Sequence, residues 1–398
     1  MGQNAHARRA LCYALLVPER SLAKLLETRR VILCVGCGGV GKTTTTAALG
    51  LAAAKRGMRV LCLTIDPARR RAQNLGRSGE KNEATSVDHA LLERVGVPAG
   101  GALTVMRVDT KETFDALVRQ LAPTPERRDR ILSNVLYKYI STSLAGTQEY
   151  MAMEKLYALR DDPSYDIVLL DTPPTTHALD FLDAPERLVS AIDSPAIKWF
   201  LQAFESDRKL SFNLLARSTA TLLRGLGKLT GGGFLEQVAA FISEMNAVFV
   251  GWKARAEMVS AALRGPTVGY VLVTTPDPLA LREVRFFADR LRKEQIAPDA
   301  CVVNRVSPEL ASTEDPAAAL ARAGLPADAA FAAKCQEAAS DAQRMAKLDR
   351  LHLLAIELLL EETTHVTVPT FARDVYDLAA LSEVAAVLAP AAPAASPA

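Results

Sequence analysis

The sequence lacks the long apolar runs that carry a chain across a membrane. Within its 398 residues, no stretch approaches the roughly 20 consecutive apolar residues that a transmembrane helix needs. The run "ALCYALLV" at 10–17 is short and has no small-x-small cleavage pattern after it, so a secretory signal is not indicated. We therefore expect a cytoplasmic protein without an integral membrane span, in which any membrane role is peripheral or exerted through a client.

A charge excess of either sign is missing too. Lys plus Arg number 47 and Asp plus Glu number 45, which leaves a formal net charge of +2. No global field therefore attracts the chain to nucleic acid or to an anionic membrane. Cysteine is scarce, at six residues, and the single C-x-x-C pair, Cys34 and Cys37, straddles an expected buried strand and its following loop. Free thiols are thus a better interpretation than a disulfide or a metal site.

The sequence does contain a repeated alternation of short apolar runs and helical stretches. Strands this apolar, separated by helices, predict an α/β fold with a doubly wound, mostly parallel sheet that is covered by helices on both faces. With 49% hydrophobic residues, the chain can bury a core of that size. The expected strands are residues 31–35, 59–65, 102–108, 165–171, 267–275, 299–306 and 365–369.

The loop after the first expected strand, "VGCGGVGKTT" at 35–44, fits the pattern G-x-x-x-x-G-K-[ST] from Gly36 to Thr43. In such a loop the backbone N–H groups and the positive end of the following helix face phosphate oxygens. Lys42 then reaches the β- and γ-phosphates, Thr43 supplies a hydroxyl to Mg²⁺, and Thr44 bonds the α-phosphate. The weaker pattern G-x-G-x-x-G also fits, but it leaves Lys42 and Thr43 unexplained. The nucleotide-binding residues predicted here are Gly38, Gly39, Val40, Gly41, Lys42, Thr43 and Thr44.

Two carboxylates end other expected strands. Asp171 follows four apolar residues in "DIVLLDTPP", which is the position of a Walker B acid, and Asp66 ends the strand in "CLTIDPARRR". Ligands of parallel α/β sheets bind at the carboxyl ends of the strands, so both acids and the loop should converge on one crevice. For Asp66, which precedes a proline, a plain turn-forming role is the alternative.

A helical insert at about 188–263 interrupts the strand alternation. It contains one apolar helix stripe, which packs on the protein's own core or presents a surface to a partner. The chain thus divides into an N-terminal helical extension (1–29), a P-loop domain (30–390) that includes the insert, and a low-complexity tail (391–398) that we expect to be disordered. The stripe consists of Leu235, Val238, Ile242, Met245 and Phe249.

The motifs, taken in order, resemble those of the ArsA-type ATPases, which include arsenite-efflux ATPases and targeting ATPases for tail-anchored membrane proteins. That family belongs to the deviant Walker A group of dimeric P-loop ATPases, together with MinD and ParA. The resemblance spans about residues 30 to 390, and D-T-P-P-T-x-H after the Walker B strand separates the family from MinD and ParA. The matching stretches are "GCGGVGKTTTTAALGLAAAKRG", "TIDPARR" and "DTPPTTHALDFL".

The resemblance implies ATP and Mg²⁺ as cofactors and assigns roles to several residues. Asp66 would orient or activate the attacking water, and Asp171 would hold Mg²⁺ through water. The segment 171–177 would be a switch that senses the γ-phosphate. Asn304 and the backbone near Pro369 and Phe371 would hold the adenine. The insert falls where the targeting ATPases keep their client-binding helices.

The chain departs from the family pattern at two places. The family loop reads K-G-G-V-G-K-T, and its first lysine reaches the partner subunit's phosphates, whereas Cys37 occupies that position here. A neutral side chain cannot stabilise transferred charge, so hydrolysis should be slow unless another cation substitutes. The nearest candidates are Arg69, Arg70 and Arg71, although a solvated charge run is the favoured interpretation of these three residues.

The second departure concerns metal-binding cysteines. Where the targeting ATPases place a C-x-x-C pair for a zinc shared between subunits, this chain has only Cys335. One cysteine per subunit cannot build a tetrahedral Zn–S₄ site, and no metalloid-binding cysteine pair is evident, which argues against arsenite transport.

The leading hypothesis is an ATP-hydrolysing dimer, formed with an identical subunit or a paralogue, which couples its nucleotide state to a protein client. One alternative is an ATP-binding scaffold with little turnover, suggested by Cys37. A second alternative is an ATPase that binds DNA, as ParA does, or a membrane, as MinD does. The near-neutral charge of the chain argues against this second alternative.

Overall fold

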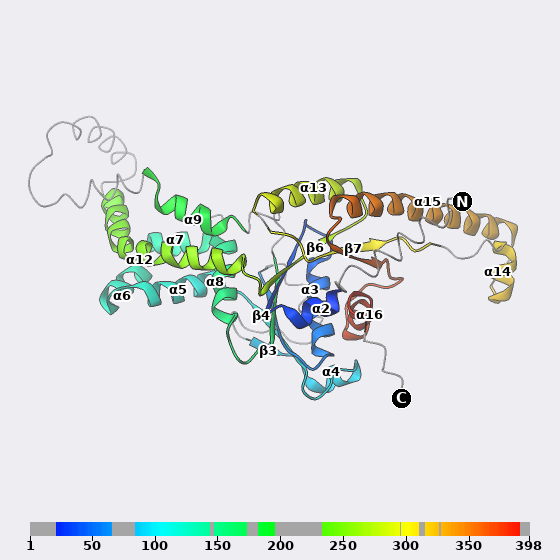
Figure 1. Ribbon diagram of the computed structural model, residues 1–398, viewed down its shortest axis with the longest axis horizontal. Coiled ribbons are helices and arrows are strands. Elements are labelled where there is room, and N and C mark those ends of the chain that lie inside the picture. The colour runs from blue at the N-terminus through cyan, green and yellow to red at the C-terminus, as the bar shows by residue number, and fades with distance from the viewer. Residues whose placement is uncertain are drawn as a thin grey trace, which may run out of the picture. The chain divides into compact units, whose positions relative to one another are not determined.

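The computed structural model describes residues 21–65, 84–143, 147–172, 182–195, 233–294, 296–309, 315–325 and 328–390. The chain forms two compact units, which are coloured by residue number in Figure 1. The sheet unit comprises Met1–Met106, Asp162–Leu179 and Pro266–Ala398, and the helical unit comprises Arg107–Asp161 and Asp180–Gly265. The predicted tail (391–398) and most of the predicted N-terminal extension lie outside the described residues.

In the part of the chain that the structure describes, one eight-stranded sheet has the order β3-β4-β2-β5-β1-β6-β7-β8. The pairs β2–β5, β5–β1, β1–β6, β6–β7 and β7–β8 are parallel, and β3–β4 is antiparallel. This confirms the predicted mostly parallel α/β fold. The strands are β1 (Val31–Val35), β2 (Arg59–Thr64), β3 (Ala84–Ser86), β4 (Ala102–Arg107), β5 (Ile167–Asp171), β6 (Val268–Thr274), β7 (Ala300–Val306) and β8 (Thr364–Pro369).

The position of β1 between β5 and β6 determines where a site can form. All residues of β1, β5 and β6 are buried, as expected for central strands covered on both faces. After β1, the strands β2 to β5 all lie on one side of β1 in the sheet, and β6 to β8 lie on the other. The carboxyl end of β1 is therefore a topological switch point, where ligands of such sheets bind. The edge strand β3, with the short polar sequence ATS, was not predicted because it has no apolar signal.

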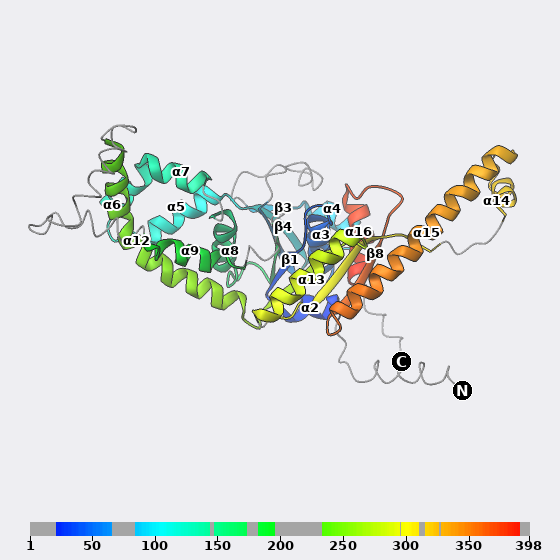
Figure 2. The same ribbon diagram turned by 90° about the horizontal axis from the view of Figure 1, so that it is seen from above.

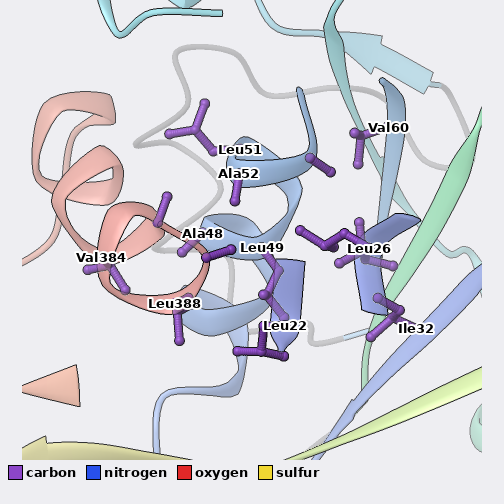
Figure 3. Close-up of a cluster of buried hydrophobic side chains, with 14 of the residues drawn as sticks. Leu22, Leu26, Ile32, Ala48, Leu49, Leu51, Ala52, Val60, Val384 and Leu388 are labelled. Carbon is purple, nitrogen blue, oxygen red and sulfur yellow. The ribbon is translucent and has the colours of Figure 1, made fainter. Parts of the chain in front are cut away.

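Helices cover the sheet and complete its core. Figure 3 shows Leu22 and Leu26 of α2 near Ala48 and Leu49 of α3, and α16 contributes Val384 and Leu388 to the same cluster. Ser21 caps α2, because its hydroxyl accepts from Lys24 N at 3.1 Å. The helices of this unit are α2 (Leu22–Thr28), α3 (Lys42–Ala54), α4 (His89–Arg94), α13 (Pro278–Lys293), α14 (Pro316–Arg322), α15 (Ala329–Leu359) and α16 (Leu378–Leu388).

The helical unit packs around aromatic side chains. Trp252 meets Phe114 edge-on at 4.7 Å between ring centroids, and Tyr150 lies 6.0 Å from the same indole. Beside them, Arg255 and the buried Glu154 form an ion pair at 2.8 Å. The helices are α5 (Thr110–Leu121), α6 (Pro125–Ser133), α7 (Val135–Ser143), α8 (Thr147–Leu159), α9 (Ala184–Ile192) and α12 (Gly233–Leu263).

The apolar stripe of the insert falls on α12 and mostly serves the core of its own unit. Of the predicted stripe, Met245 is buried, whereas Val238, Ile242 and Phe249 are half-buried. The buried positions of α12 are shifted by about one residue from the predicted stripe. They recur every three or four residues, as on the core-facing side of a helix. They are Phe241, Met245, Val248, Trp252, Ala256, Val259 and Leu263.

Candidate nucleotide-binding site

The loop between β1 and α3 depends on glycine at two positions. Gly41 is the N-cap residue of α3 and has a left-handed φ of 101°, and a Cβ placed there would lie 2.2 Å from Asn304 Nδ2. Gly36 has a φ of 152°, and its Cβ would lie 2.1 Å from the carbonyl oxygen of Val273. A larger residue at position 36 would clash with the backbone of β6, and one at position 41 would displace the Asn304 side chain. Gly38 and Gly39 are exposed and Val40 is buried, so the middle of the loop faces solvent.

Lys42, the first residue of α3, folds back over the loop. Its side chain is only 6% exposed, and Nζ donates to the carbonyl oxygen of Cys37 at 2.7 Å. The ammonium therefore lies inside the curve of the loop, where the pattern places phosphate oxygens. Thr44 follows on the same first turn and is half-buried.

The predicted hydroxyl and carboxylate of the metal site lie in contact. Thr43 Oγ1 donates to Asp171 Oδ2 at 2.6 Å. Asp171 is 3% exposed, and the parallel pairing of β1 with β5 places it beside Cys34 at the carboxyl end of the sheet. Thr64, at the end of β2, lies 3.4 Å from the same carboxylate oxygen. Thr64 was not singled out from the sequence, although a polar residue that ends an apolar strand is a usable signal.

These two groups fit the protein's share of a magnesium site. Mg²⁺ in phosphate-transfer sites is bound through one or two carboxylates, phosphate oxygens and water rather than by an all-protein cage. Consistent with that, the described residues contain no group of three or more His, Cys, Asp or Glu side chains that could hold a metal ion by itself. Thr43 and Asp171 would thus hold the ion jointly with the nucleotide.

The segment after Asp171 is tied to β1 at its start. The Thr172 hydroxyl donates to the carbonyl oxygen of Cys34 at 2.9 Å, which holds the second residue of the predicted switch (171–177) against the central strand. The rest of that switch lies outside the described residues, as do Asp66 and the candidate cations Arg69, Arg70 and Arg71.

The residues predicted to hold the adenine lie at the carboxyl ends of β7 and β8. Asn304 Nδ2 donates to the carbonyl oxygen of Val40 at 2.9 Å, so its amide contacts the phosphate loop directly. Its Oδ1 accepts from Arg305 N at 3.0 Å, and Arg305 has a positive φ of 60°. Pro369 ends β8 beside Val306, and Phe371 follows it half-buried against the core.

Cys37 is half-buried beside α13 and the end of β6. It lines a small cavity of about 10 Å³ together with Glu283, Val284 and Phe287. Burial, and after it the nearby Glu283 carboxylate, raise the pKa of the Cys37 thiol above its usual value. The thiol is therefore neutral near pH 7. Glu283 could not be predicted as the neighbour of Cys37, because the two residues lie 246 positions apart in the sequence.

The other described cysteines are free thiols in the interior or on α15. Burial raises the pKa of the Cys34 thiol to about 12, so this half of the C-x-x-C pair is unreactive near neutral pH. Cys34, Cys37, Cys62, Cys301 and Cys335 form no disulfide.

Comparison with known proteins agrees with this geometry. The family described as anion-transporting ATPases matches residues 29–389. Among similar proteins, "ATPase GET3" of Malassezia globosa is 25% identical over 289 residues, which is 72% of this chain and 76% of that protein. "ATPase GET3" of Paracoccidioides lutzii is 25% identical over 303 residues, 74% of this chain and 79% of that protein. "ATPase ASNA1 homolog" of Entamoeba dispar is 29% identical over 180 residues, which is 44% of this chain and 52% of that protein.

The family match covers nearly the whole chain and includes every strand and helix that positions the loop. The resemblance drawn from the loop and the Walker B strand is thereby confirmed. The chain belongs to the ArsA-type family of anion-transporting ATPases and is, by that membership, a nucleotide-binding ATPase.

Proposed function

We propose that the protein is a magnesium-dependent ATPase that works slowly, as a dimer, and couples its nucleotide state to a protein client. The contact between Thr43 and Asp171, next to the inward-folded Lys42 ammonium, carries this proposal. An ammonium, a hydroxyl and a carboxylate around one glycine loop are the groups with which P-loop ATPases hold nucleotide phosphates and Mg²⁺.

The contacts of these residues indicate what each does when MgATP binds. Lys42 Nζ exchanges the carbonyl oxygen of Cys37 for phosphate oxygens, which leaves the charge buried and still paired. Thr43 would offer its hydroxyl to the metal in place of Asp171, and Asp171 would help to hold the ion through water. Bound Mg²⁺ neutralises phosphate charge and orients the leaving group. The N–H groups of Gly38 to Gly41 and the start of α3 add their dipoles.

Water attack and signalling are assigned to residues outside the described part of the chain. In our proposal, Asp66 orients and activates the water, and segment 171–177 responds to the γ-phosphate. The bond from Thr172 to Cys34 supports the second assignment, because it fixes one end of the segment beside the phosphate loop. The adenine is held by Asn304 and by the backbone near Pro369 and Phe371, which share the carboxyl edge of the sheet with the loop.

Slow turnover follows from the surroundings of Cys37. The thiol is neutral and Glu283 adds negative charge beside it, so this position does not supply a cation to a developing phosphate charge. In a dimer, formed with an identical subunit or with a paralogue, a cation of the partner subunit would have to stabilise this phosphate charge. Arg69, Arg70 or Arg71 of a second copy is our candidate.

A client would bind at the helical insert. Val250 and Met258 on α12 are exposed apolar residues of the insert, and the resemblance to targeting ATPases points to the same region. We place the protein in the cytoplasm. In the residues that the structure describes, no helix is long and apolar enough to cross a membrane.

Binding and hydrolysis of MgATP by purified protein test the proposal. Wild type should bind MgATP, Lys42→Ala should bind it much more weakly, and Asp66→Asn should bind it while hydrolysing it more slowly. If neither wild type nor Asp66→Asn binds MgATP, the proposal fails. If both hydrolyse it equally fast, Asp66 has no catalytic role.

One further candidate is favoured by Cys37, namely an ATP-binding scaffold with negligible turnover. A single-turnover experiment separates the two. Bound MgATP that is recovered intact after many hours supports the scaffold, and steady release of phosphate supports the slow ATPase. Because the chain belongs to the ArsA-type family, we do not propose the ParA-like or MinD-like alternatives.

A further inference from the structure

We propose that Arg305 binds the base of the nucleotide by laying its guanidinium against one face of the purine ring. Arg305 lies near the carboxyl end of β7, directly after Asn304. This role rests on the proposed function, because it needs a nucleotide whose phosphates lie in the glycine loop. It adds a side-chain contact to a base that would otherwise be held by Asn304 and by backbone alone.

The backbone of Arg305 has a conformation that arginine rarely adopts. Its φ is 60°, and among the described residues every other residue with a positive φ is a glycine. A Cβ makes this left-handed conformation unfavourable, so glycine or asparagine is the usual residue at such a position. Backbone strain persists only where surrounding contacts impose it, and it is concentrated at sites that bind ligands. An arginine here therefore indicates that the side chain has a function.

Contacts on both sides impose this conformation. Asn304 Oδ1 accepts from Arg305 N at 3.0 Å, while Asn304 Nδ2 donates to the carbonyl oxygen of Val40 at 2.9 Å. One amide thus joins the backbone of Arg305 to the phosphate loop. On the other side, Thr370 N donates to the carbonyl oxygen of Val306 at 2.9 Å, and the register of β7 against β8 is irregular just before Val306. The strained residue is therefore held at the junction of the loop, β7 and β8.

This junction is also where the proposed site holds the base. Asn304 precedes Arg305, and Pro369 pairs with the residue that follows it. Figure 2 shows β8 near α16, which contacts both β8 and α3, the helix that begins at the loop. The Arg305 side chain is exposed, and no hydrogen bond or ion pair with the described residues holds its guanidinium. The group is therefore free to contact a ligand.

The guanidinium suits the base better than the phosphates. It is planar and weakly hydrated, and it stacks on aromatic rings, whose faces attract its charge. The phosphate loop follows β1, whereas Arg305 lies two strands away, about 10 Å along the sheet. A nucleotide with its phosphates beside Lys42 would thus reach Arg305 with its base. Stacking accepts any purine face, so the contact adds affinity without selecting adenine over guanine.

Calorimetric binding of MgATP and of magnesium tripolyphosphate tests the contact, because tripolyphosphate has phosphates but no base. Arg305→Ala and Arg305→Gly should each bind MgATP about tenfold more weakly than wild type. Both should bind tripolyphosphate as wild type does. Arg305→Lys is the matched control for charge, because it keeps the cation without the plane, and it should also lose MgATP affinity several-fold. All three variants retain the backbone N–H that Asn304 binds.

Urea unfolding without nucleotide tests the backbone strain. Arg305→Gly should unfold at a higher urea concentration than Arg305→Ala, since only glycine adopts this φ without strain. The reverse order would overturn the proposal, as would unchanged MgATP affinity in Arg305→Ala. An equal loss of MgATP and tripolyphosphate affinity would place the guanidinium at the phosphates and overturn it as well. A wild type that binds neither ligand refutes the proposed function and this contact together, whereas variants that bind both ligands like wild type refute the contact alone.

Discussion

Replacing Cys37 with lysine tests whether position 37 controls the rate of ATP hydrolysis. The family lysine at this position is directed at the partner's phosphates, and cations that act in this way contribute roughly 10³-fold or more to phosphoryl transfer. In this protein, however, the side chain at position 37 shares its small cavity with Glu283. A new ammonium has a carboxylate partner in its own subunit, so Cys37→Lys alone should recover only part of that gain.

The size of the shortfall follows from the exposure of the pair. Glu283 is half-buried on α13, and an ion pair of that exposure is worth about 1 kcal/mol. If breaking this ion pair adds about 1 kcal/mol to the activation free energy of hydrolysis, the rate falls about fivefold. The double variant Cys37→Lys with Glu283→Gln should therefore hydrolyse ATP about five times faster than Cys37→Lys, and both should be faster than wild type.

Single-turnover hydrolysis at saturating MgATP is the assay, because it is insensitive to product release. Cys335→Lys, which adds the same charge on α15, is the matched control and should have the wild-type rate. Two results would refute the reasoning. Equal rates in wild type and both Cys37→Lys variants mean that position 37 does not approach the phosphates. Equal acceleration in the single and double variants means that Glu283 does not hold the lysine.

Three other changes test the described packing. Gly36→Ala should lower the free energy of unfolding by about 3 kcal/mol in urea titrations, since its Cβ meets a backbone carbonyl, whereas Gly39→Ala, with open space around its Cβ, should cost about 1 kcal/mol. Arg255→Met should lower the free energy of unfolding by about 3 kcal/mol, because it leaves Glu154 buried without its cation. The double variant with Glu154→Leu should lower it less, and an equal loss in both variants would contradict this. Because the pKa of Cys37 is raised above 9.0, its alkylation followed by mass spectrometry should still accelerate beyond pH 9, and a plateau below that pH would contradict the burial of the thiol.

The sheet was predictable because its strands are buried on both faces and carry their signal in composition. Runs such as 31–35 are wholly apolar and bounded by turn residues, so β1 was predicted to the residue. The edge strand β3 consists of three small residues, two of them polar, and becomes a strand only through pairing with β4. In the insert, the buried stripe lies about one residue away from the predicted one, because Trp252 and not Phe249 contacts Phe114 and Tyr150. Contacts of this kind cannot be predicted from the periodicity of apolar residues.

The site was predictable wherever chemistry and topology coincide in a short stretch. Lys42 and Thr43 follow from the loop pattern, and Asp171 follows from its place at the end of a buried strand. What local patterns cannot show is the set of contacts between distant segments. Asn304 binds the phosphate loop at Val40, and Glu283 approaches Cys37, because β6 and β7 lie on one side of β1.

The order of the strands thus has a consequence for how substitutions at the loop should be interpreted. β6 and β7 supply Val273 and Asn304 as the walls against which Gly36 and Gly41 pack, while β5 supplies Asp171 to Thr43 from the other side. Substitutions at different positions of the loop therefore act on strands on either side of β1. Cys37 lies at a small cavity that α13 and the end of β6 line together. Because Gly36 and Gly41, and not the side chain at position 37, hold the loop against these walls, we expect a change of charge at position 37 to alter the rate of hydrolysis without loss of nucleotide binding.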